Sequence, residues 1–369
     1  MTGEVLVACP SCGAVVAEGE RFCENCGADL TGAPSPGPAP AAAQPVATVR
    51  AGVAVAPVDL AALPVVCAAC GGTIADDGYC EQCGTPAVRP RDHWIDQPVL
   101  WVAAVCDRGV RHTRNEDAVA VAAESAPGSF AALVVCDGVS SAPDSDLASL
   151  AAARAARDVL AGPELSGALD AGDADRGPLL AQAIEAAGLA AHGAASDVAR
   201  RVAGEGRGNP PSTTFVAGVL AGRRLVVGSV GDSRAYWIPD DGDAVQLSTD
   251  DSWAAEAMSL GLSREEAESG PNAHAITRWL GADAPDPRPR TVERALDGAG
   301  WVLLCSDGLW NYCSEASELA ALVAEQSQGL ASDAPGEQVP VGPLATALVA
   351  WAVDAGGADN ISVALARVE

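Results

Sequence analysis

The chain has 369 residues, with 22 basic and 49 acidic side chains, for a net charge of −27. Its length predicts two or three domains, and 49% hydrophobic against 19% charged residues predicts that most of the chain folds. A surface this acidic repels phosphate backbones and anionic lipids, so we expect no binding to nucleic acid or to a membrane. All basic residues are arginines, which excludes Walker-A ATPases, protein kinases and lysine Schiff-base enzymes.

The N-terminal region predicts neither a membrane span nor a signal peptide. Residues 31–49 are uncharged but contain five prolines, which a spanning helix does not tolerate. The first residues, MTGEVLVACPSCG, lack a basic start and a long apolar run. We therefore expect a cytoplasmic protein whose thiols stay reduced.

Eight of the twelve cysteines form four CxxC pairs, arranged in two modules. Ten residues separate the pairs of the first module and nine separate those of the second. Four thiolates at this spacing can hold one zinc ion in a closed tetrahedral site, whereas a reducing compartment and the repeated spacing disfavour disulfides or redox motifs. We expect two structural zinc ions, with Cys9, Cys12, Cys23 and Cys26 as ligands in the first module and Cys67, Cys70, Cys80 and Cys83 in the second.

The two modules are predicted zinc ribbons at residues 1–30 and 65–86. Each is too small to hold a core, so zinc should supply its folding energy. Both are acidic and lack the cations that nucleic-acid-binding ribbons need, which leaves a docking site for a protein partner or a purely structural cap as equal alternatives. The Pro/Ala-rich segment between them, residues 31–64, is predicted to be a semi-extended, disordered linker.

From residue 97 to 369 the pattern changes to apolar strands and alanine-rich helices. Strands are predicted at 99–106, 130–136, 213–220, 224–230, 233–238, 301–305 and 361–368, and helices at 146–160, 179–202, 315–325 and 343–353. Short connections over residues 213–238 indicate antiparallel pairing. Because strands are grouped and helices come in consecutive pairs, we expect an α+β domain whose sheets are covered by helices.

Acidic residues recur where these strands begin or end. They are Asp137, Asp232, Asp307 and Asp359, with a further pair, Glu116–Asp117, near the start of the domain. Carboxylates gathered at one rim repel one another unless cations hold them, and oxygen ligands select magnesium or manganese. Two such ions bridged by one aspartate can activate water and neutralise a phosphoryl group, so the sequence predicts phosphoester hydrolysis.

Eight short segments of this domain follow one another in the order RNED, DG, STTF, GDSRAY, LSTDDS, TRWLG, CSDGLW and ADNIS. This ordered set covers nearly all of residues 98–369 and resembles the metal-dependent (PPM-type) serine/threonine protein phosphatases. The resemblance implies an α-β-β-α sandwich with a binuclear manganese or magnesium centre at one end. It also implies hydrolysis of phosphoserine and phosphothreonine in protein substrates by water that the two ions activate.

The resemblance assigns a role to each matching residue. Asp137 corresponds to the ligand that bridges the ions, and Gly138 to a ligand through its backbone carbonyl. Asp307 and Asp359 correspond to ligands of the second ion. Glu116 and Asp117 correspond to acids that hold metal or its bound water. Asp232 corresponds to a ligand of a third and weaker ion, and Asn360 to a residue that braces the last ligand.

Two departures from the family pattern affect this assignment. The family has a phosphate-binding arginine four residues before the glutamate, where this chain has His112; we expect Arg111 to take the role, with Arg114 or His112 as the alternatives. The two glycines expected after Asp137–Gly138 are replaced by residues 139–141, Val-Ser-Ser, so that loop must differ.

Ser212–Thr214 is expected as a strand entry near the site, and residues 252–274 as a flap that shapes substrate access.

An active phosphatase is the leading interpretation. The second is a catalytically silent adaptor, in which the ribbons dock a partner and the phosphatase fold recognises phosphoprotein. A zinc-ribbon nucleic-acid protein ranks last because of the charge. The four remaining cysteines are expected to be small buried hydrophobes: Cys106, Cys136, Cys305 and Cys313.

Overall fold

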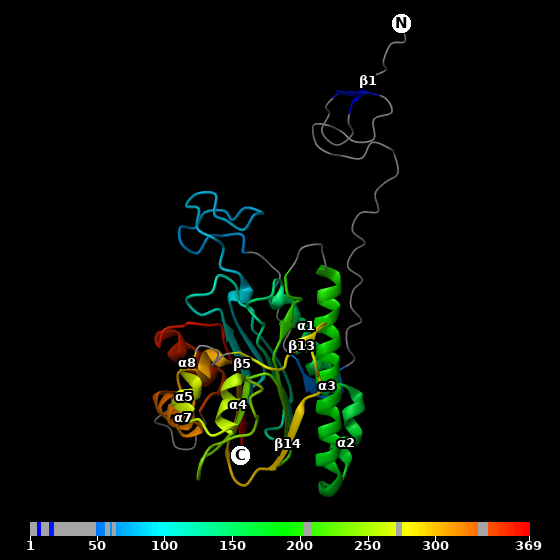
Figure 1. The fold of residues 1–369 in the computed structure, drawn as a ribbon, viewed down its shortest axis with the longest axis vertical. Coiled ribbons are helices and arrows are strands. Elements are labelled where there is room, and N and C mark those ends of the chain that lie inside the picture. The colour runs from blue at the N-terminus through cyan, green and yellow to red at the C-terminus, as the bar shows by residue number, and fades with distance from the viewer. Residues whose placement is uncertain are drawn as a thin grey trace. The chain divides into compact units, whose positions relative to one another are not determined.

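Figure 1 shows the fold of the chain as a computed structural model. The structure describes residues 6–8, 15–17, 49–55, 60, 64–202, 208–270, 275–330 and 339–369. Contacts divide the chain into two units, residues 1–47 and 48–369. In the first unit, β1 (Leu6–Ala8) pairs antiparallel with β2 (Val15–Ala17). The predicted zinc ligands of the first module lie outside the described residues: Cys9, Cys12, Cys23 and Cys26. Among the described helices, none is long and apolar enough to cross a bilayer.

Two six-stranded antiparallel sheets form the centre of the second unit. The first has the order β14-β10-β9-β7-β6-β3, and the second has the order β12-β11-β15-β16-β5-β4. The strands of the first sheet are β3 (Val53–Ala54), β6 (Ala118–Glu124), β7 (Phe130–Cys136), β9 (Phe215–Ala221), β10 (Arg224–Val230) and β14 (Arg290–Ala295). Those of the second are β4 (His93–Val99), β5 (Val102–Asp107), β11 (Arg234–Pro239), β12 (Val245–Gln246), β15 (Gly300–Cys305) and β16 (Ile361–Val368).

Helices cover the outer faces of both sheets (Figure 1). Helices α1 (Ser145–Ala161) and α3 (Asp173–Val202) pack on the first sheet, and α7 (Ala316–Leu330) and α8 (Val341–Asp354) pack on the second. The predicted α-β-β-α sandwich is therefore confirmed. The shorter elements are η1 (Pro90–Asp92), η2 (Pro163–Leu165), α2 (Ser166–Asp170), β8 (Ser212–Thr213), α4 (Trp253–Ser259), α5 (Arg264–Glu268), β13 (Leu280–Gly281) and α6 (Asp307–Trp310).

Three apolar layers hold the sandwich together: one under α1 and α3, one between the sheets, and one under α7 and α8. The inner face of α1 carries alanines at helical spacing, including Ala148, Ala152 and Ala156, so this helix lies close to its sheet and to α3. The middle layer packs side chains of both sheets against each other, such as Leu133 and Leu304. This packing fixes the strand ends, where the acidic residues lie.

The chain changes sheets between β10 and β11. The predicted antiparallel run over residues 213–238 is right for β9 and β10, which pair, but wrong for β11, which pairs with β15 in the second sheet. Gly231 makes the crossing with a φ of 97°, and a Cβ there would lie 2.8 Å from the side chain of Thr214. The crossing places Asp232 at the junction of the two sheets.

Part of the segment expected as a linker forms an edge strand instead. Within residues 49–55, β3 pairs with β6, and valines of this stretch pack against the layer under α1. The Arg50 amide donates to the Ala161 carbonyl at 2.9 Å, and its guanidinium pairs with Glu124 at 2.8 Å and lies 4.4 Å from the Phe130 ring centroid. The proline-rich composition obscured these valines, so the expectation of a free tether is wrong for residues 49–55.

Several described elements were not predicted, each for a physical reason. β6 reads AVAVAAE, and alanine has low strand propensity. β14 is polar and almost wholly exposed, as an edge strand can be. Helix α3 begins at residue 173 rather than 179, and Pro178 lies inside its first two turns.

Asp96 is a buried acid in β4 whose ionisation opposes folding. Its side chain faces inward beside Trp94, and one oxygen accepts from the Val121 amide at 3.3 Å. The other carboxylate oxygen has no partner among the described residues. Burial raises the pKa of Asp96 to about 6. Because this value lies above that of an unfolded aspartate, stability falls as the pH rises from about 4 to about 6.

We predict that Asp96→Asn raises the free energy of unfolding at pH 7 by up to about 3 kcal/mol, because the amide keeps the bond from Val121 without a buried charge. The gain should shrink at pH 4, where the wild-type carboxyl is protonated. Denaturant unfolding at both pH values measures it, with the exposed Asp354→Asn as control. An equal gain at both pH values would contradict this account.

Candidate metal centre

The predicted acidic ligands all lie at one end of the two sheets. Asp137 follows β7, and Glu116–Asp117 precedes β6; since Ala118 pairs with Cys136, these acids share a rim. In the second sheet, Asp307 follows β15 and Asp359 precedes β16, whose neighbouring ends are paired in the same way. Acids up to 243 residues apart in sequence therefore meet at one place.

Electrostatics shows how closely these carboxylates are gathered. Burial and the charges of neighbouring aspartates raise the pKa of Asp137 well above its ordinary value, and those neighbours are Asp117, Asp307, Asp359 and Asp232. Burial, followed by the charges of Asp307 and Asp250, likewise raises the pKa of Asp232. Such a group of buried carboxylates is energetically costly without a compensating cation, so its position favours cation binding.

Asp117 is the most deeply buried of these acids. Burial raises its pKa to about 7, and the charges of Asp359 and Asp307 add to this, while a hydrogen bond from Ser306 acts against it. The Ser306 hydroxyl donates to Asp117 Oδ2 at 2.7 Å and accepts from the Ser362 amide at 2.9 Å. Ser306 thus ties Asp117 of the first sheet to β16 of the second.

Glu116 is held by three side chains. Ser140 donates to Oε2 at 2.8 Å, Ser145 donates to Oε1 at 2.9 Å, and Arg114 forms an ion pair with the same carboxylate. Although burial opposes it, this set lowers the pKa of Glu116, with Arg114 as the largest favourable cause. Ser140 belongs to the Val-Ser-Ser stretch that departs from the family pattern, and in this structure it supports Glu116.

Asn360 links the last strand to the segment that precedes Glu116. Its Oδ1 accepts from the Glu116 amide at 2.7 Å, and its Nδ2 donates to the carbonyls of Arg108 and Arg114 at 2.7 and 3.1 Å. Its own amide donates to Asp359 Oδ1 at 2.8 Å. The predicted brace therefore contacts both Asp359 and Glu116.

The backbone around Asp137 is fixed by the STT segment. The Thr214 amide and the Thr213 hydroxyl both donate to the Asp137 carbonyl at 2.8 Å, and the Asp137 amide donates to the Thr214 hydroxyl at 3.0 Å. At Gly138 a Cβ would lie 2.5 Å from the Glu116 carbonyl oxygen, so no larger residue fits. The expectation that Ser212–Thr214 packs near the site agrees with these contacts.

The donor set fits hard divalent cations. The predicted ligands offer carboxylate and backbone oxygens, which favour magnesium or manganese. Within the described residues, no three of these carboxylates bring ligand oxygens within 4.8 Å of one another, so the acids do not form a compact cluster around a single point. Two ions about 3.5–4 Å apart suit such an arrangement.

The second cysteine module has the geometry of a zinc site. The ligand atoms of Cys67, Cys70, Cys80 and Cys83 all lie within 4.8 Å of one another. The Cys67–Cys83 and Cys70–Cys80 sulfur distances are 3.7 and 3.5 Å, close to the edge of a tetrahedron with zinc–sulfur bonds of about 2.3 Å. A hydrogen bond with the Thr85 side chain is the main cause that lowers the pKa of Cys83 to about 6, which favours a thiolate.

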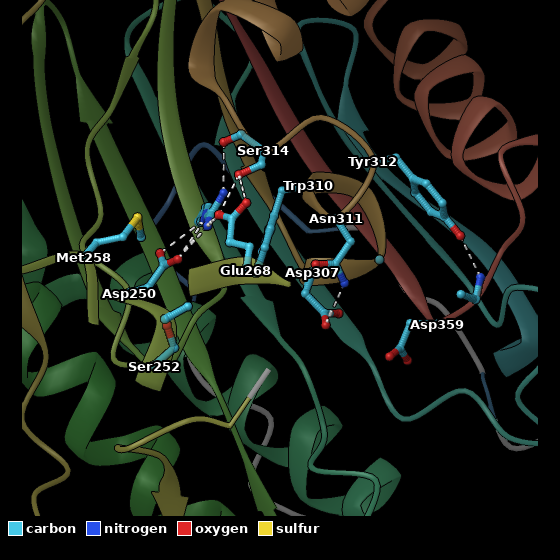
Figure 2. Close-up of a pocket in the computed structure, with 14 residues that line it drawn as sticks. Asp250, Ser252, Met258, Glu268, Asp307, Trp310, Asn311, Tyr312, Ser314 and Asp359 are labelled. Atoms are coloured by element: carbon cyan, nitrogen blue, oxygen red, sulfur yellow. Dashed lines mark hydrogen bonds and ion pairs between the residues drawn. The ribbon is translucent and has the colours of Figure 1, made fainter. Parts of the chain in front are cut away.

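A pocket of about 500 Å³ opens beside the acids (Figure 2). Asp307 and Asp359 lie on one side, and the helices α4 and α5 of the predicted flap contribute Met258 and Glu268. Buried Arg234 pairs with Asp250 at 2.7 Å and also lies 3.6 Å from Glu268. The pocket therefore lies between the acidic centre and residues 252–268; His274, the end of the predicted flap, is outside the described residues.

The three candidates for a phosphate-binding residue are placed differently. Arg114 is paired with Glu116 and lies 3.8 Å from Asp146. His112 lies between two acids, 3.2 Å from Asp359 and 3.6 Å from Glu116. The side chain of Arg111 is exposed.

The protein phosphatase 2C family model matches residues 108–351, and the double zinc ribbon model matches residues 9–84. The chain belongs to the protein phosphatase 2C family. The predicted resemblance to metal-dependent serine/threonine phosphatases, with zinc ribbons in the N-terminal part, is confirmed.

Relatives and solved structures agree with this assignment. The chain is 32% identical over 275 residues to the serine/threonine protein phosphatase PstP of Mycobacterium tuberculosis, covering 73% of this chain and 45% of PstP. It is 30% identical over 158 residues to the serine/threonine phosphatase stp of Listeria innocua, covering 42% of this chain and 57% of that protein. The chain thus spans about half the length of the curated relatives it matches.

The fold of the second unit is that of the solved family members. The crystal structure of M. tuberculosis PstP/Ppp aligns with a TM-score of 0.54 at 28% identity, covering 73% of this chain and 99% of that chain. The catalytic domain of PstP in complex with 2 manganese ions aligns with a TM-score of 0.51 at 28% identity and the same coverage of both chains.

Sequence reasoning missed the groups that support the acids. Ser140, Ser145 and Ser306 orient the carboxylates of Glu116 and Asp117, and nothing in a lone serine signals this. Arg234 and Asp250 lie in the quoted GDSRAY and LSTDDS segments, so their position was visible although their pairing was not. The four remaining cysteines are buried, as predicted: Cys106, Cys136, Cys305 and Cys313.

We predict that Asp307→Asn makes the metal-free protein more stable, because it removes one of the charges that repel Asp137 and Asp232. The melting temperature in chelator should rise by roughly 2–6 °C. Manganese should raise the melting temperature of the wild type but have little effect on the variant, since a ligand is lost. Calorimetry measures both, with the exposed Asp354→Asn as control. A variant that is stabilised by manganese as strongly as the wild type would contradict the assignment.

We also predict that replacing Cys70 and Cys83 by serine lowers the zinc content from about two ions per chain to about one. Elemental analysis after dialysis against a weak chelator measures this. Cys313→Ser, which changes a buried thiol outside the cluster, should leave the zinc content unchanged. Retention of two ions in the double variant would show that these residues hold no zinc.

Proposed function

We propose that this chain hydrolyses phosphoserine and phosphothreonine in proteins at a binuclear manganese or magnesium centre. The observation that carries the proposal is the convergence of Asp137, Asp307 and Asp359 on one partly buried place, where their mutual repulsion calls for cations. Two ions held there would activate a water and neutralise the charge that develops on the phosphoryl group. The PstP catalytic domain, which was solved with 2 manganese ions, supports this choice of metal.

We assign the ligands as follows. Asp137 would bridge the ions, the Gly138 carbonyl would serve one of them, and Asp307 and Asp359 would serve the other. Glu116 and Asp117 would hold metal or its water, and Asp232, at the sheet crossing, would serve a third and weaker ion. Asn360 would keep the Glu116 backbone and Asp359 in register through the hydrogen bonds described above.

We assign phosphate binding to Arg111. Arg114 is occupied by Glu116, and His112 lies against two acids that are needed as ligands. Arg111 is exposed, and its guanidinium would bind the oxygens of a phosphorylated substrate.

We propose a structural zinc ion for each ribbon, with ribbons at 1–30 and 65–86, a linker at 31–64 and the phosphatase domain at 97–369. β3, within residues 49–55, and the start of β4, which precedes residue 97, belong to the two sheets of that domain. Phosphorylated proteins would be the substrates, and a protein partner could dock on the ribbons. We propose a cytoplasmic location, where thiols stay reduced and can bind zinc.

A catalytically silent adaptor is the second candidate. It is favoured by one observation, the histidine at the family's arginine position, whose ring lies 3.2 Å from Asp359. In that case the acids would bind metal and phosphoprotein without turnover.

We predict manganese-dependent hydrolysis of p-nitrophenyl phosphate and of a phosphothreonine peptide by the full chain. Asp307→Ala should lower kcat by at least about a thousandfold, because one ion loses its ligand. The exposed Asp354→Ala serves as control. No turnover by the wild type while calorimetry shows manganese bound would favour the adaptor.

We predict that Arg111→Ala lowers kcat/KM for the phosphopeptide by tenfold or more, mainly through KM, because it removes charge-assisted hydrogen bonds to substrate. Manganese affinity, measured by calorimetry, should stay unchanged. His112→Ala and Arg114→Ala are tested in parallel. If His112→Ala produces the larger rise in KM and Arg111→Ala none, phosphate binding belongs to His112.

A further inference from the structure

The second zinc ribbon, residues 65–86, continues directly into the part of the chain that supports the acidic centre. The ribbon has a small apolar core of Cys67, Ile74 and Cys80, and Ala87 packs against it. The Ala87 amide donates to the Gly78 carbonyl at 2.8 Å. Because two of the core residues are predicted zinc ligands, the position of Ala87 depends on the fold that zinc binding stabilises.

A hydrogen-bonded turn begins at Arg89, two positions after Ala87. In this turn the Arg89 amide donates to Asp92 Oδ2 at 2.9 Å, and the Asp92 amide donates to the Arg89 carbonyl at 2.8 Å. Pro90 restricts its backbone. The Asp92 carbonyl in turn accepts from the Arg108 amide at 2.8 Å, which fixes the turn to the end of β5. Only three residues therefore separate Ala87, which packs on the ribbon core, from Arg91.

Arg91 reaches from this turn under the acidic segment. Its Nε donates to the Asn115 carbonyl at 3.1 Å, and its Nη2 donates to the Asp117 carbonyl at 3.1 Å and to the Asp146 carbonyl at 2.5 Å. The side chain of Asn115 returns a bond to the Arg91 carbonyl at 3.0 Å. One guanidinium thus holds the carbonyls on both sides of Glu116.

The remaining carbonyl of this segment is held through a shared partner. The Ser149 hydroxyl donates to the Glu116 carbonyl at 2.5 Å, and Arg91 Nη2 lies 3.3 Å from the same hydroxyl. The guanidinium is largely buried, and burial lowers the pKa of Arg91. A buried cation whose hydrogen bonds go to backbone carbonyls fixes where those peptides lie, and the peptides of residues 115–117 set where the Glu116 and Asp117 carboxylates point.

We propose that Arg91 is a positioning residue for the carboxylate centre, and that the zinc-bound second ribbon holds Arg91 in place. Zinc binding at the cysteines would then strengthen manganese binding at the acids. The inference rests on the proposed function for the identity of that centre as a manganese site, but it concerns metal affinity rather than turnover. It gives the second ribbon a role in preparing the catalytic domain, beyond a cap or a docking module.

The first test is Arg91→Ala in the full chain, with zinc loaded. We expect manganese affinity, measured by calorimetry, to fall about tenfold or more, as is usual when a group that orients metal ligands is lost. Zinc content should stay at the wild-type value. Arg91→Lys, which keeps a donor for one of the carbonyls, should give an intermediate affinity. The exposed Arg89→Ala, which removes the same charge two residues away, should bind manganese like the wild type.

The second test connects the ribbon to Arg91. Replacing Cys70 and Cys83 by serine should weaken manganese binding by a similar factor, whereas the same change at Cys9 and Cys12 of the first module should not. Combining the Cys70 and Cys83 changes with Arg91→Ala should weaken binding little further, because both act through one contact. Fully additive losses would show that the ribbon and Arg91 act separately.

Wild-type manganese affinity in Arg91→Ala would overturn the proposal, and so would wild-type affinity in the zinc-free second ribbon. Denaturant unfolding of each variant identifies any loss of affinity that comes from partial unfolding. Because the measured quantity is manganese binding, a wild type that binds manganese without hydrolysing phosphopeptide would refute the proposed activity and leave this inference testable. A hydrolysing wild type with an unaffected Arg91→Ala variant would refute the inference alone.

Discussion

The main constraint on this structure is the repulsion among the carboxylates that the two sheets bring to one rim. Antiparallel pairing puts the end of β7 beside the start of β6, and the end of β15 beside the start of β16. Asp137, Asp307 and Asp359 therefore meet because the strands are in register, although each alone would be more stable in water. A fold that accepts this unfavourable arrangement needs both a cation to offset it and a rigid frame to maintain it.

The frame is built from neutral donors and a few buried arginines. The hydroxyl groups of Ser306 and Ser145 donate hydrogen bonds to carboxylates, and because they are neutral they leave the negative charge available to a metal ion. Ser145 lies in a helix, and Ser306 lies in the opposite sheet's strand-end segment. In the pocket wall, Arg234 of β11 pairs with Asp250 and lies near Glu268 of α5, which links the flap segment to the second sheet. An arginine thus offsets the acids of the pocket wall, whereas Asp117 in the centre is supported by a neutral hydroxyl.

Apolar runs ending in Asp-Gly were enough to predict sheets covered by helices and acids at their rim, and the resemblance to the phosphatase family supplied the α-β-β-α sandwich. The change of sheet at Gly231 could not be predicted, because a short connection looks the same whether the strand pairs locally or crosses. The support of Glu116 by Ser140 and Ser145 also left no signal, since it depends on a helix and a loop meeting in space. The edge strand β3 could not be predicted either, because the proline-rich sequence around it indicated a linker.

Arg91 shows why the boundary between ribbon and phosphatase domain is the least predictable part of the chain. In sequence it lies in RPRDH, between two modules, where a connecting segment is the natural interpretation. In space, its hydrogen bonds run to residues 24 and 26 positions further on, and these flank a carboxylate of the centre. The ribbon ends at residue 86, five positions before Arg91. Loss of the ribbon fold would therefore change how the chain enters the catalytic domain, because the two proposed metal sites share one stretch of backbone.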